Sequence, residues 1–148
     1  SIRVPLLVAG PDVPANKKID ADVYLQDIMA SAIDIAGVDK PEYIDFNSLM
    51  PLVRGERSES FYPEIYGGYR VFHRMIRADG FKLIVYPRIH VMRLYDLTKD
   101  PFELNDITDD PGYAETKVNL YRRLIKLQKE MDDSLDLTAF FPEIQIQD

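Results

Sequence analysis

The chain has 148 residues, of which 46% are hydrophobic and 29% charged, a composition typical of a folded domain and not of a disordered segment. Its formal net charge of -7 argues against general nucleic-acid binding, because phosphate contacts need clustered basic residues over a large face. The absence of cysteine excludes disulfides, thiolate metal sites and a cysteine nucleophile, and no apolar run approaches the roughly 20 residues of a membrane-spanning helix.

The chain opens with a short apolar run, SIRVPLLVAGP, that ends at Gly10 and Pro11. A continuous run of this kind predicts a strand over residues 2–8 that is buried on both faces. The other strands predicted below form a self-contained antiparallel sheet, so this first strand has no partner in the chain. We therefore expect the chain to be the C-terminal piece of a larger α/β protein, beginning just before the last strand of its main sheet.

A helix is predicted over residues 24–36, where apolar residues recur at helical spacing after a loop over residues 11–18. Gly37 follows at the position where a helix commonly ends in the left-handed conformation. Residues 38–60 contain Pro41, Pro51 and Gly55 and show no sustained period. This second stretch is predicted to run over the surface without regular structure.

Four strands are predicted next, over residues 61–66, 69–78, 81–86 and 91–97. The pairs Gly67–Gly68 and Asp79–Gly80 lie between apolar runs and tolerate the positive φ of tight hairpin turns, and residues 87–90 supply a third reversal. Connections this short leave no room for parallel crossovers. The sequence therefore predicts a four-stranded antiparallel meander.

A long C-terminal helix is predicted after Asp110, a candidate N-cap followed by Pro111 in the first turn. An apolar stripe runs from Tyr113 to Leu135 and would cover the apolar face of the meander. The predicted fold class is α+β: the meander packed on this helix, preceded by a strand and a helix from the end of an α/β domain. We place the tail of that domain at residues 1–55 and the sheet-plus-helix subdomain at residues 56–148.

Four segments, in order along the chain, resemble motifs of sulfatases. IRVPLLVAGP is similar to G-G-x-R-V-P followed by hydrophobic residues, and DIMASAIDIAG resembles D-hydrophobic-x-P-T-hydrophobic-hydrophobic-D-hydrophobic-A-G. RMIRADGFKLI resembles R-x-V-R-T-x-x-Y-K-hydrophobic-I, and LYDLTKDPFELNDI resembles L-Y-D-L-x-x-D-P-x-E-x-x-N-L. The chain departs from the family pattern at Ala30 and Ser31, where Pro and Thr are usual, and at Asp106, where Asn is usual. These departures concern the start of the helix and the geometry of a turn.

The resemblance implies an alkaline phosphatase-like N-terminal catalytic domain, missing from this chain, followed by the C-terminal subdomain of sulfatases. It also implies a formylglycine nucleophile, made from Cys or Ser in a C-x-P-S-R type motif, beside a divalent cation, which we expect to be calcium. The chain has no cysteine and no S-x-P-S-R sequence. We therefore expect no catalytic residue and no metal ligand in this chain, and sulfate ester hydrolysis only by the full-length enzyme. The sequence assigns no cellular location, although the resemblance is compatible with a periplasmic or secreted parent.

One basic strip lies in this acidic chain. Between Arg70 and Arg93 there are six Lys and Arg residues and a single acid, Asp79. A simple interpretation is that these bases form exposed ion pairs, each worth about 0–1 kcal/mol. In sulfatases, however, the C-terminal subdomain leans over the active-site cleft. The resemblance thus implies that Tyr69, His73 and Arg74 contact an anionic sugar or an aryl sulfate, since arginine donates two parallel hydrogen bonds to such groups.

Four further residues are expected to be structural. Arg3, in an apolar segment, would pair with a carboxylate of the missing domain, because a buried charge needs a partner. Asp96, Asp100 and Glu103 lie in a turn motif where acids usually cap backbone N–H groups, and this interpretation is preferred to a glycosidase-like carboxylate pair. The histidines, His73 and His90, lack the spacing of a zinc site.

Three alternatives remain open at this stage. A phosphodiesterase or phosphonate hydrolase of the same superfamily would have the same C-terminal motifs. A non-catalytic module would bind a sulfated glycan through the basic sheet alone. Apolar surface left exposed by the missing domain would favour homo-oligomers.

Overall fold

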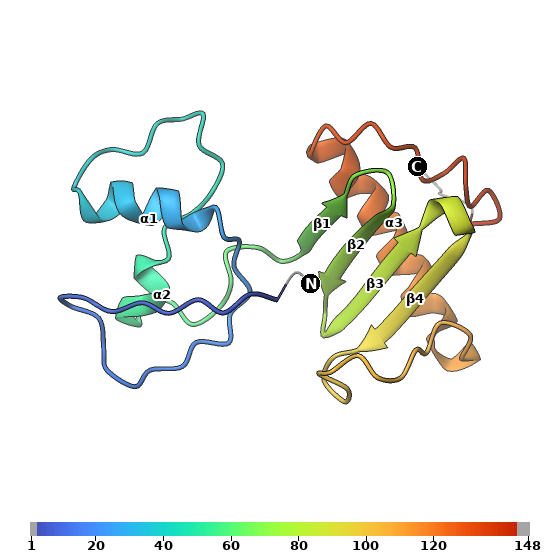
Figure 1. The fold of residues 1–148 in the computed structure, drawn as a ribbon, viewed down its shortest axis with the longest axis horizontal. Helices are drawn as coiled ribbons and strands as arrows, with labels where there is room; N and C mark the ends of the chain where they lie inside the picture. The colour runs from blue at the N-terminus through green and yellow to red at the C-terminus, as the bar shows by residue number, and fades with distance from the viewer. Residues whose placement is uncertain (1–2, 145–148) are drawn as a thin grey trace. The chain divides into compact units, whose positions relative to one another are not determined.

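The computed structural model describes residues 3–144, and its elements are shown in Figure 1. The chain divides into two compact units, Ser1–Pro63 and Glu64–Asp148, which are considered separately. None of the described helices combines the length and the apolar character that a membrane crossing requires.

The first unit contains two helices, α1 (Asp27–Ile35) and α2 (Met50–Arg54). The predicted helix is confirmed as α1, and Gly37 has φ +66, in the left-handed region expected there. Helix α2 was not predicted, because five residues are too few to show a period. It has Pro51 in its first turn and ends at Gly55 with φ +83, so the two residues that indicated a loop instead begin and end a helix.

The strand predicted at the start of the chain is absent from the described residues. Ile2 lies outside them, and residues 3–9 have no regular secondary structure. Val4, Leu7 and Val8 are 55%, 93% and 46% exposed, so the described residues do not cover this segment, and its burial against polypeptide outside this chain stays a prediction. The physical reason is that a strand satisfies its backbone groups only through a neighbouring strand, and none pairs with this segment in the described part of the chain.

Asp27 organises the first unit from the start of α1. Its buried carboxylate accepts hydrogen bonds from Tyr24 N at 2.8 Å, from Asn47 N at 3.2 Å and from the Tyr62 hydroxyl. Ser31, at the usual family threonine, donates its hydroxyl to the Asp27 carbonyl at 2.7 Å and accepts from Leu49 N at 2.8 Å. The substitution of Thr by Ser therefore keeps a hydroxyl that joins α1 to the residue preceding α2.

The second unit is the predicted meander and helix. Its sheet has the order β1-β2-β3-β4, with β1 (Ile65–Tyr69), β2 (His73–Ala78), β3 (Phe81–Tyr86) and β4 (Val91–Asp96) all antiparallel. The turn at Asp79 and Gly80 has φ of +52 and +78, as predicted, and β3 has the predicted bounds. A short 3-10 helix, η1 (Pro87–Ile89), makes the third reversal. The predicted α+β fold class is confirmed.

The first hairpin is shifted from its predicted place. Gly67 and Gly68 lie inside β1, and the turn consists of Arg70, Val71 and Phe72. An ideal Cβ on Gly67 would stand 2.9 Å from Met75 Cε, and one on Gly68 would stand 3.1 Å from Arg74 Cδ. The two glycines are thus required because side chains of β2 lie across the β1 backbone, a long-range reason that the local turn pattern does not contain.

The C-terminal helix is shorter than predicted. Pro111–Tyr113 form a 3-10 turn, η2, that leads into α3 (Ala114–Glu130), and Leu135 lies beyond the helix. Asp132 has φ +51, and Asp133 N donates to the Gln128 carbonyl at 2.9 Å, which closes the helix with a left-handed cap. We call residues 131–144, which follow the helix, the C-terminal strap.

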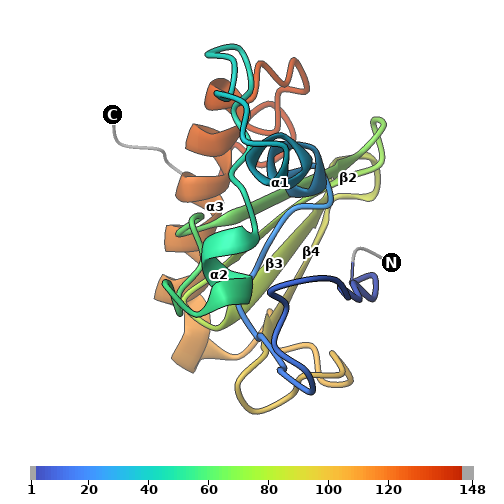
Figure 2. The same ribbon diagram turned by 90° about the vertical axis from the view of Figure 1, so that its left-hand side faces the viewer.

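The core of the second unit lies between α3 and one face of the sheet. Figures 1 and 2 show α3 crossing that face, which we call the helix face. The strap contributes Leu137 and Phe141 to the same core, and Tyr121 donates its hydroxyl to the Leu137 carbonyl at 3.0 Å. The buried core residues are Ile76, Ala78, Leu83, Val85, Leu94, Leu120, Tyr121, Leu124, Ile125, Leu137 and Phe141.

We predict that Leu124→Ala lowers the free energy of unfolding of the second unit by about 2–5 kcal/mol, since Leu124 is 0% exposed and the truncation leaves a cavity. Leu104, which is 79% exposed, is the matched control, and Leu104→Ala is expected to change stability by less than about 0.5 kcal/mol. Urea unfolding followed by circular dichroism measures both. Equal losses in the two variants would contradict the assignment of this core.

Candidate functional site

Two of the three predicted substrate-binding residues lie together, and the third does not. Tyr69 and His73 face each other across the first hairpin and belong to the face opposite α3. Arg74 follows His73 in β2, so its side chain lies on the helix face. Because Arg74 is only 7% exposed and is paired within the second unit, we leave it out of the substrate-contacting set.

Four rings form a continuous row across three elements, from the first turn to the end of β3. Phe72 stacks on Tyr69 with ring centroids 5.9 Å apart, Tyr69 on His73 at 5.7 Å, and His73 lies 5.4 Å from Tyr86. We call these four residues the aromatic row. Tyr69 and Phe72 are 55% and 46% exposed, so the row presents ring surface outward.

Sequence reasoning missed Phe72 and Tyr86 as members of this set. Tyr86 could have been predicted. A two-residue turn at Asp79 and Gly80 sets the antiparallel register that pairs Arg74 with Val85, and this register places Tyr86 beside His73. Phe72 could not be identified in this way, because the predicted turn at Gly67 and Gly68 begins three residues before the observed one and so places Phe72 inside a strand.

Positive charge flanks the aromatic row. The guanidinium of Arg88, in η1, lies 5.8 Å from the centre of the Phe72 ring, a cation–π contact. Arg70 is exposed at the turn itself. Within residues 3–144 neither side chain has an ion-pair partner, so both charges are available to an anionic ligand.

His73 adds a neutral ring to the site and not a charge. Burial lowers the pKa of His73 below its ordinary value, and the adjacent Arg74 guanidinium lowers the same pKa further. The imidazole is therefore uncharged at neutral pH, where it can stack and exchange hydrogen bonds. Together, the outward rings and the two guanidinium groups, which have no ion-pair partner in the described part of the chain, fit a sugar ring that carries an anionic substituent.

Arg74 is held by the strap. Its guanidinium forms a two-pronged ion pair with Asp133, with Arg74 Nη2 2.8 Å from Asp133 Oδ1 and Arg74 Nε on Oδ2. The Tyr66 hydroxyl donates to the same carboxylate. These hydrogen bonds hold the pKa of the Asp133 carboxyl well below its usual range. The sequence did not reveal Asp133 as the partner, because 59 positions separate it from Arg74.

The acids of the turn motif have structural partners. Asp96 accepts from Thr98 and Lys99, and Asp100 accepts from Asn105 N at 2.7 Å. Glu103 is bound by Lys82 Nζ at 2.7 and 2.8 Å, an ion pair that was not predicted. Asp106, at the usual family asparagine, accepts from Leu94 N at 3.1 Å and so retains the acceptor that the turn needs.

Arg3 is exposed and has no ion-pair partner within residues 3–144, so its proposed pairing with another part of the protein stays a prediction. The described residues also contain no group of three or more His, Asp or Glu side chains that could hold a metal ion. No step of the chemistry is assigned to a metal in the described residues.

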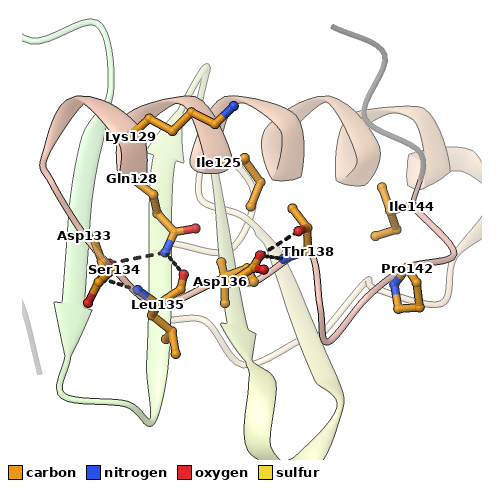
Figure 3. A pocket seen from close by; sticks show the side chains of 11 residues that line it. Ile125, Gln128, Lys129, Asp133, Ser134, Leu135, Asp136, Thr138, Pro142 and Ile144 are labelled. Atoms are coloured by element: carbon orange, nitrogen blue, oxygen red, sulfur yellow. Dashed lines mark hydrogen bonds between the residues drawn. The ribbon is translucent and has the colours of Figure 1, made fainter.

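A hollow of about 490 Å³ lies between α3 and the strap (Figure 3). Some of its polar groups are bound to one another: Gln128 Nε2 donates to the Leu135 carbonyl at 2.8 Å, and Asp136 accepts from Thr138 N and Thr138 Oγ1. A ligand in the hollow would have to compete with these hydrogen bonds, and no aromatic ring among the described residues lines the hollow. The aromatic row is therefore the better candidate site.

The Arg74–Asp133 pair predicts a specific dependence of stability on pH. Asp133→Asn is expected to cost about 3 kcal/mol at pH 7, because it leaves a buried guanidinium without its counter-charge. The folded-state pKa of Asp133 is depressed, so its contribution is present above the unfolded value of about 3.9 and is lost as the pH falls further. Urea unfolding between pH 3 and 7 should show the gap between wild type and variant narrowing below about pH 4. Asp109→Asn, at an exposed acid, is the control and should follow the wild type; a gap independent of pH would contradict the ionic origin.

The relatives of this chain among characterised proteins are sulfatases. The chain is 29% identical over 123 residues to Delta 4,5-hexuronate-2-O-sulfatase of Bacteroides thetaiotaomicron, an alignment that covers 76% of this chain and 26% of the relative. It is 30% identical over 146 residues to N-acetylglucosamine-6-O-sulfatase of the same species, covering 89% and 26%. Arylsulfatase K of Bos taurus is 32% identical over 120 residues, covering 72% and 22%. The chain thus spans about a quarter of the length of these relatives.

Solved structures agree. A protein in complex with its substrate D-glucosamine-2-N,6-O-disulfate matches with a TM-score of 0.64 and 29% identity, over 74% of this chain and 25% of that one. A 2-O GAG sulfatase matches with a TM-score of 0.68 and 25% identity, over 84% and 29%. A phosphonate monoester hydrolase from Silicibacter pomeroyi shares the fold with a TM-score of 0.66 at 15% identity, over 88% and 29%.

A family model described as N-sulphoglucosamine sulphohydrolase, C-terminal, matches residues 1–130, which include the opening motif, both helices of the first unit, the whole sheet and α3. The chain therefore belongs to the family of N-sulphoglucosamine sulphohydrolase C-terminal regions.

Proposed function

We propose that the whole protein hydrolyses sulfate esters on a carbohydrate and that the aromatic row of this chain contacts the sugar. The single observation that carries the proposal is the row itself: four neighbouring rings, two of them about half exposed, with Arg70 and Arg88 beside them and without an ion-pair partner among residues 3–144. The names of the relatives support the substrate class, because they act on hexuronate and N-acetylglucosamine sulfates.

The reaction itself is assigned to polypeptide outside this chain. There, a formylglycine nucleophile and a divalent cation, which we expect to be calcium, would supply the attack on sulfur and the stabilisation of its oxygens. The residues of this chain bind and orient. Exposed rings hold the apolar face of the sugar, and the two guanidinium groups attract its anionic substituents, so the ester is presented in a restricted geometry.

A phosphonate hydrolase or phosphodiesterase of the same superfamily is the nearest rival, and a phosphonate monoester hydrolase does share the fold. The discriminating measurement offers the whole enzyme a sulfated monosaccharide and, separately, aryl phosphonate monoesters and phosphodiesters. We expect a higher kcat/KM for the sulfate ester. A preference for the phosphorus substrates would overturn the sulfatase assignment and leave the fold assignment intact.

A glycan-binding module that works without catalysis is the second rival, and homo-oligomerisation through exposed apolar surface is a further proposal. Titration of the 148-residue chain with heparin-like oligosaccharides at varied salt tests the module; tight, salt-sensitive binding supports it. Light scattering tests self-association, which we expect to involve exposed apolar side chains such as Leu7, Phe102 and Leu104. A clean monomer at high concentration argues against it.

We predict that Tyr69→Ala or Phe72→Ala raises KM of the whole enzyme for its sulfated sugar about 2- to 10-fold, with kcat little changed, because each removes a ring surface worth about 0.5–1.5 kcal/mol. Arg88→Ala should raise KM similarly, and added salt should shrink that effect. Steady-state kinetics measures these changes. Tyr43→Ala, which removes an 83% exposed tyrosine of the first unit, is the matched control. Wild-type KM values in Tyr69→Ala, Phe72→Ala and Arg88→Ala would refute the contact between the aromatic row and the substrate.

A further inference from the structure

We propose that Arg74 and Asp133 are positioning residues for the aromatic row: the C-terminal strap holds the β1–β2 turn through them and so sets the spacing of the rings. The effect on substrate rests on the function proposed above, whereas the positioning itself is a property of the fold and is tested without substrate.

The Arg74 guanidinium joins the strap to the carbonyls of the turn. On one side, Nε and Nη2 donate to the Asp133 carboxylate. On the other, Nη1 donates to the carbonyls of Arg70 and His73, the latter at 3.0 Å. Four hydrogen bonds thus leave one planar group, which a lysine, with a single nitrogen, cannot reproduce in the same geometry.

Those two carbonyls belong to the segment that carries three of the four rings. Tyr69 precedes the first carbonyl, Phe72 lies between the two, and His73 carries the second, so fixing the carbonyls fixes the backbone from which the rings project. Arg70 has φ +48, a conformation that residues with a side chain adopt uncommonly. The turn therefore needs support from outside itself, and the guanidinium supplies it together with the Phe72 N to Tyr69 O hydrogen bond of 3.0 Å.

Asp133 is anchored as firmly as Arg74. Besides the guanidinium, its carboxylate accepts from the Tyr66 hydroxyl, from Gln128 Nε2 at 3.3 Å and from Leu135 N at 3.1 Å. Figure 3 shows Gln128 reaching from α3 toward Asp133 and the Leu135 segment. The carboxylate is thus tied to β1, to α3 and to the strap, so the position that it imposes on Arg74 is defined by three elements.

Gly68 makes the arrangement possible. An ideal Cβ at this position would lie 3.1 Å from Arg74 Cδ, 3.3 Å from Nε and 3.5 Å from Cζ. The guanidinium therefore lies directly over the bare backbone of β1 on its way to Asp133. This contact provides a way to displace Arg74 without removing any charge or hydrogen-bonding group.

A second arginine of the same unit separates positioning from plain stabilisation. Arg123, on α3, forms ion pairs with Glu64 at 2.7 Å and with Asp79, so it also joins the helix to the sheet. Both of these acids lie outside the β1–β2 turn. Arg123→Lys is therefore a control that disturbs an ion pair between α3 and the sheet while leaving the turn carbonyls with their partners.

The test is aromatic NMR of the 148-residue chain with Gly68→Ala, Arg74→Lys and Asp133→Asn, compared with Arg123→Lys. We expect the first three variants to shift the ring resonances of Tyr69, Phe72 and His73 in the same direction, because the rings move apart. Wider spacing exposes His73, so its titration midpoint should rise toward the ordinary value of about 6.5. Arg123→Lys should leave the rings and the titration unchanged.

Unchanged ring resonances and an unchanged His73 titration in folded Gly68→Ala and Arg74→Lys would overturn the proposal. If only stability falls, Arg74 is a structural residue and nothing more. In the whole enzyme, the same variants should raise KM for a sulfated sugar with kcat preserved. Should Tyr69→Ala leave KM unaltered while the NMR shifts occur, the proposed substrate contact fails and the positioning stands.

Discussion

The second unit depends on how one buried charge is satisfied. Arg74 lies on the helix face of the sheet, where its neighbours in register are Gly68 and Val85, and a guanidinium there must find partners or destabilise the fold. Its partners are the Asp133 carboxylate of the strap and the carbonyls of Arg70 and His73, at the start of the first turn and just after it. The hydrogen bonds that satisfy Arg74 therefore hold the strap over the core and also fix the backbone of the first turn.

Strand alternation divides the sheet into two roles. Side chains on the helix face build the core, with Ile76, Leu83 and Leu94 each 0% exposed. Side chains on the other face include Tyr69, His73 and Tyr86, and also Lys82, whose charge Glu103 neutralises. A single strand such as β2 thus contributes His73 to a candidate sugar contact and Arg74 to the support beneath it, although the two residues are adjacent.

The sequence predicted those features that depend on local chemistry. The fold class, the turn at Asp79 and Gly80, the bounds of β3 and the left-handed Gly37 follow from residue preference and periodicity. It failed where a distant side chain decides the outcome. Gly67 and Gly68 resemble turn residues until Met75 and Arg74 are placed across them, and Asp133 has no local sign of being a partner. The opening segment forms no strand in the described residues because a strand exists only with its neighbour, and its pairing outside this chain stays a prediction.

The neutrality of His73 affects how an anionic sugar would be recognised. Burial and the nearby Arg74 guanidinium both lower the pKa of His73, so the ring does not compete with Arg70 and Arg88 for the anion. The positive charge next to the row then lies at its edge, on Arg88 over the Phe72 ring, and the centre of the row is uncharged. A ligand that stacks on the rings is thereby oriented, because its anionic groups gain most when they point toward that edge. Such orientation requires a fixed spacing of the rings. A turn whose carbonyls are held by the Arg74 guanidinium keeps that spacing better than a turn held only by its own backbone hydrogen bond.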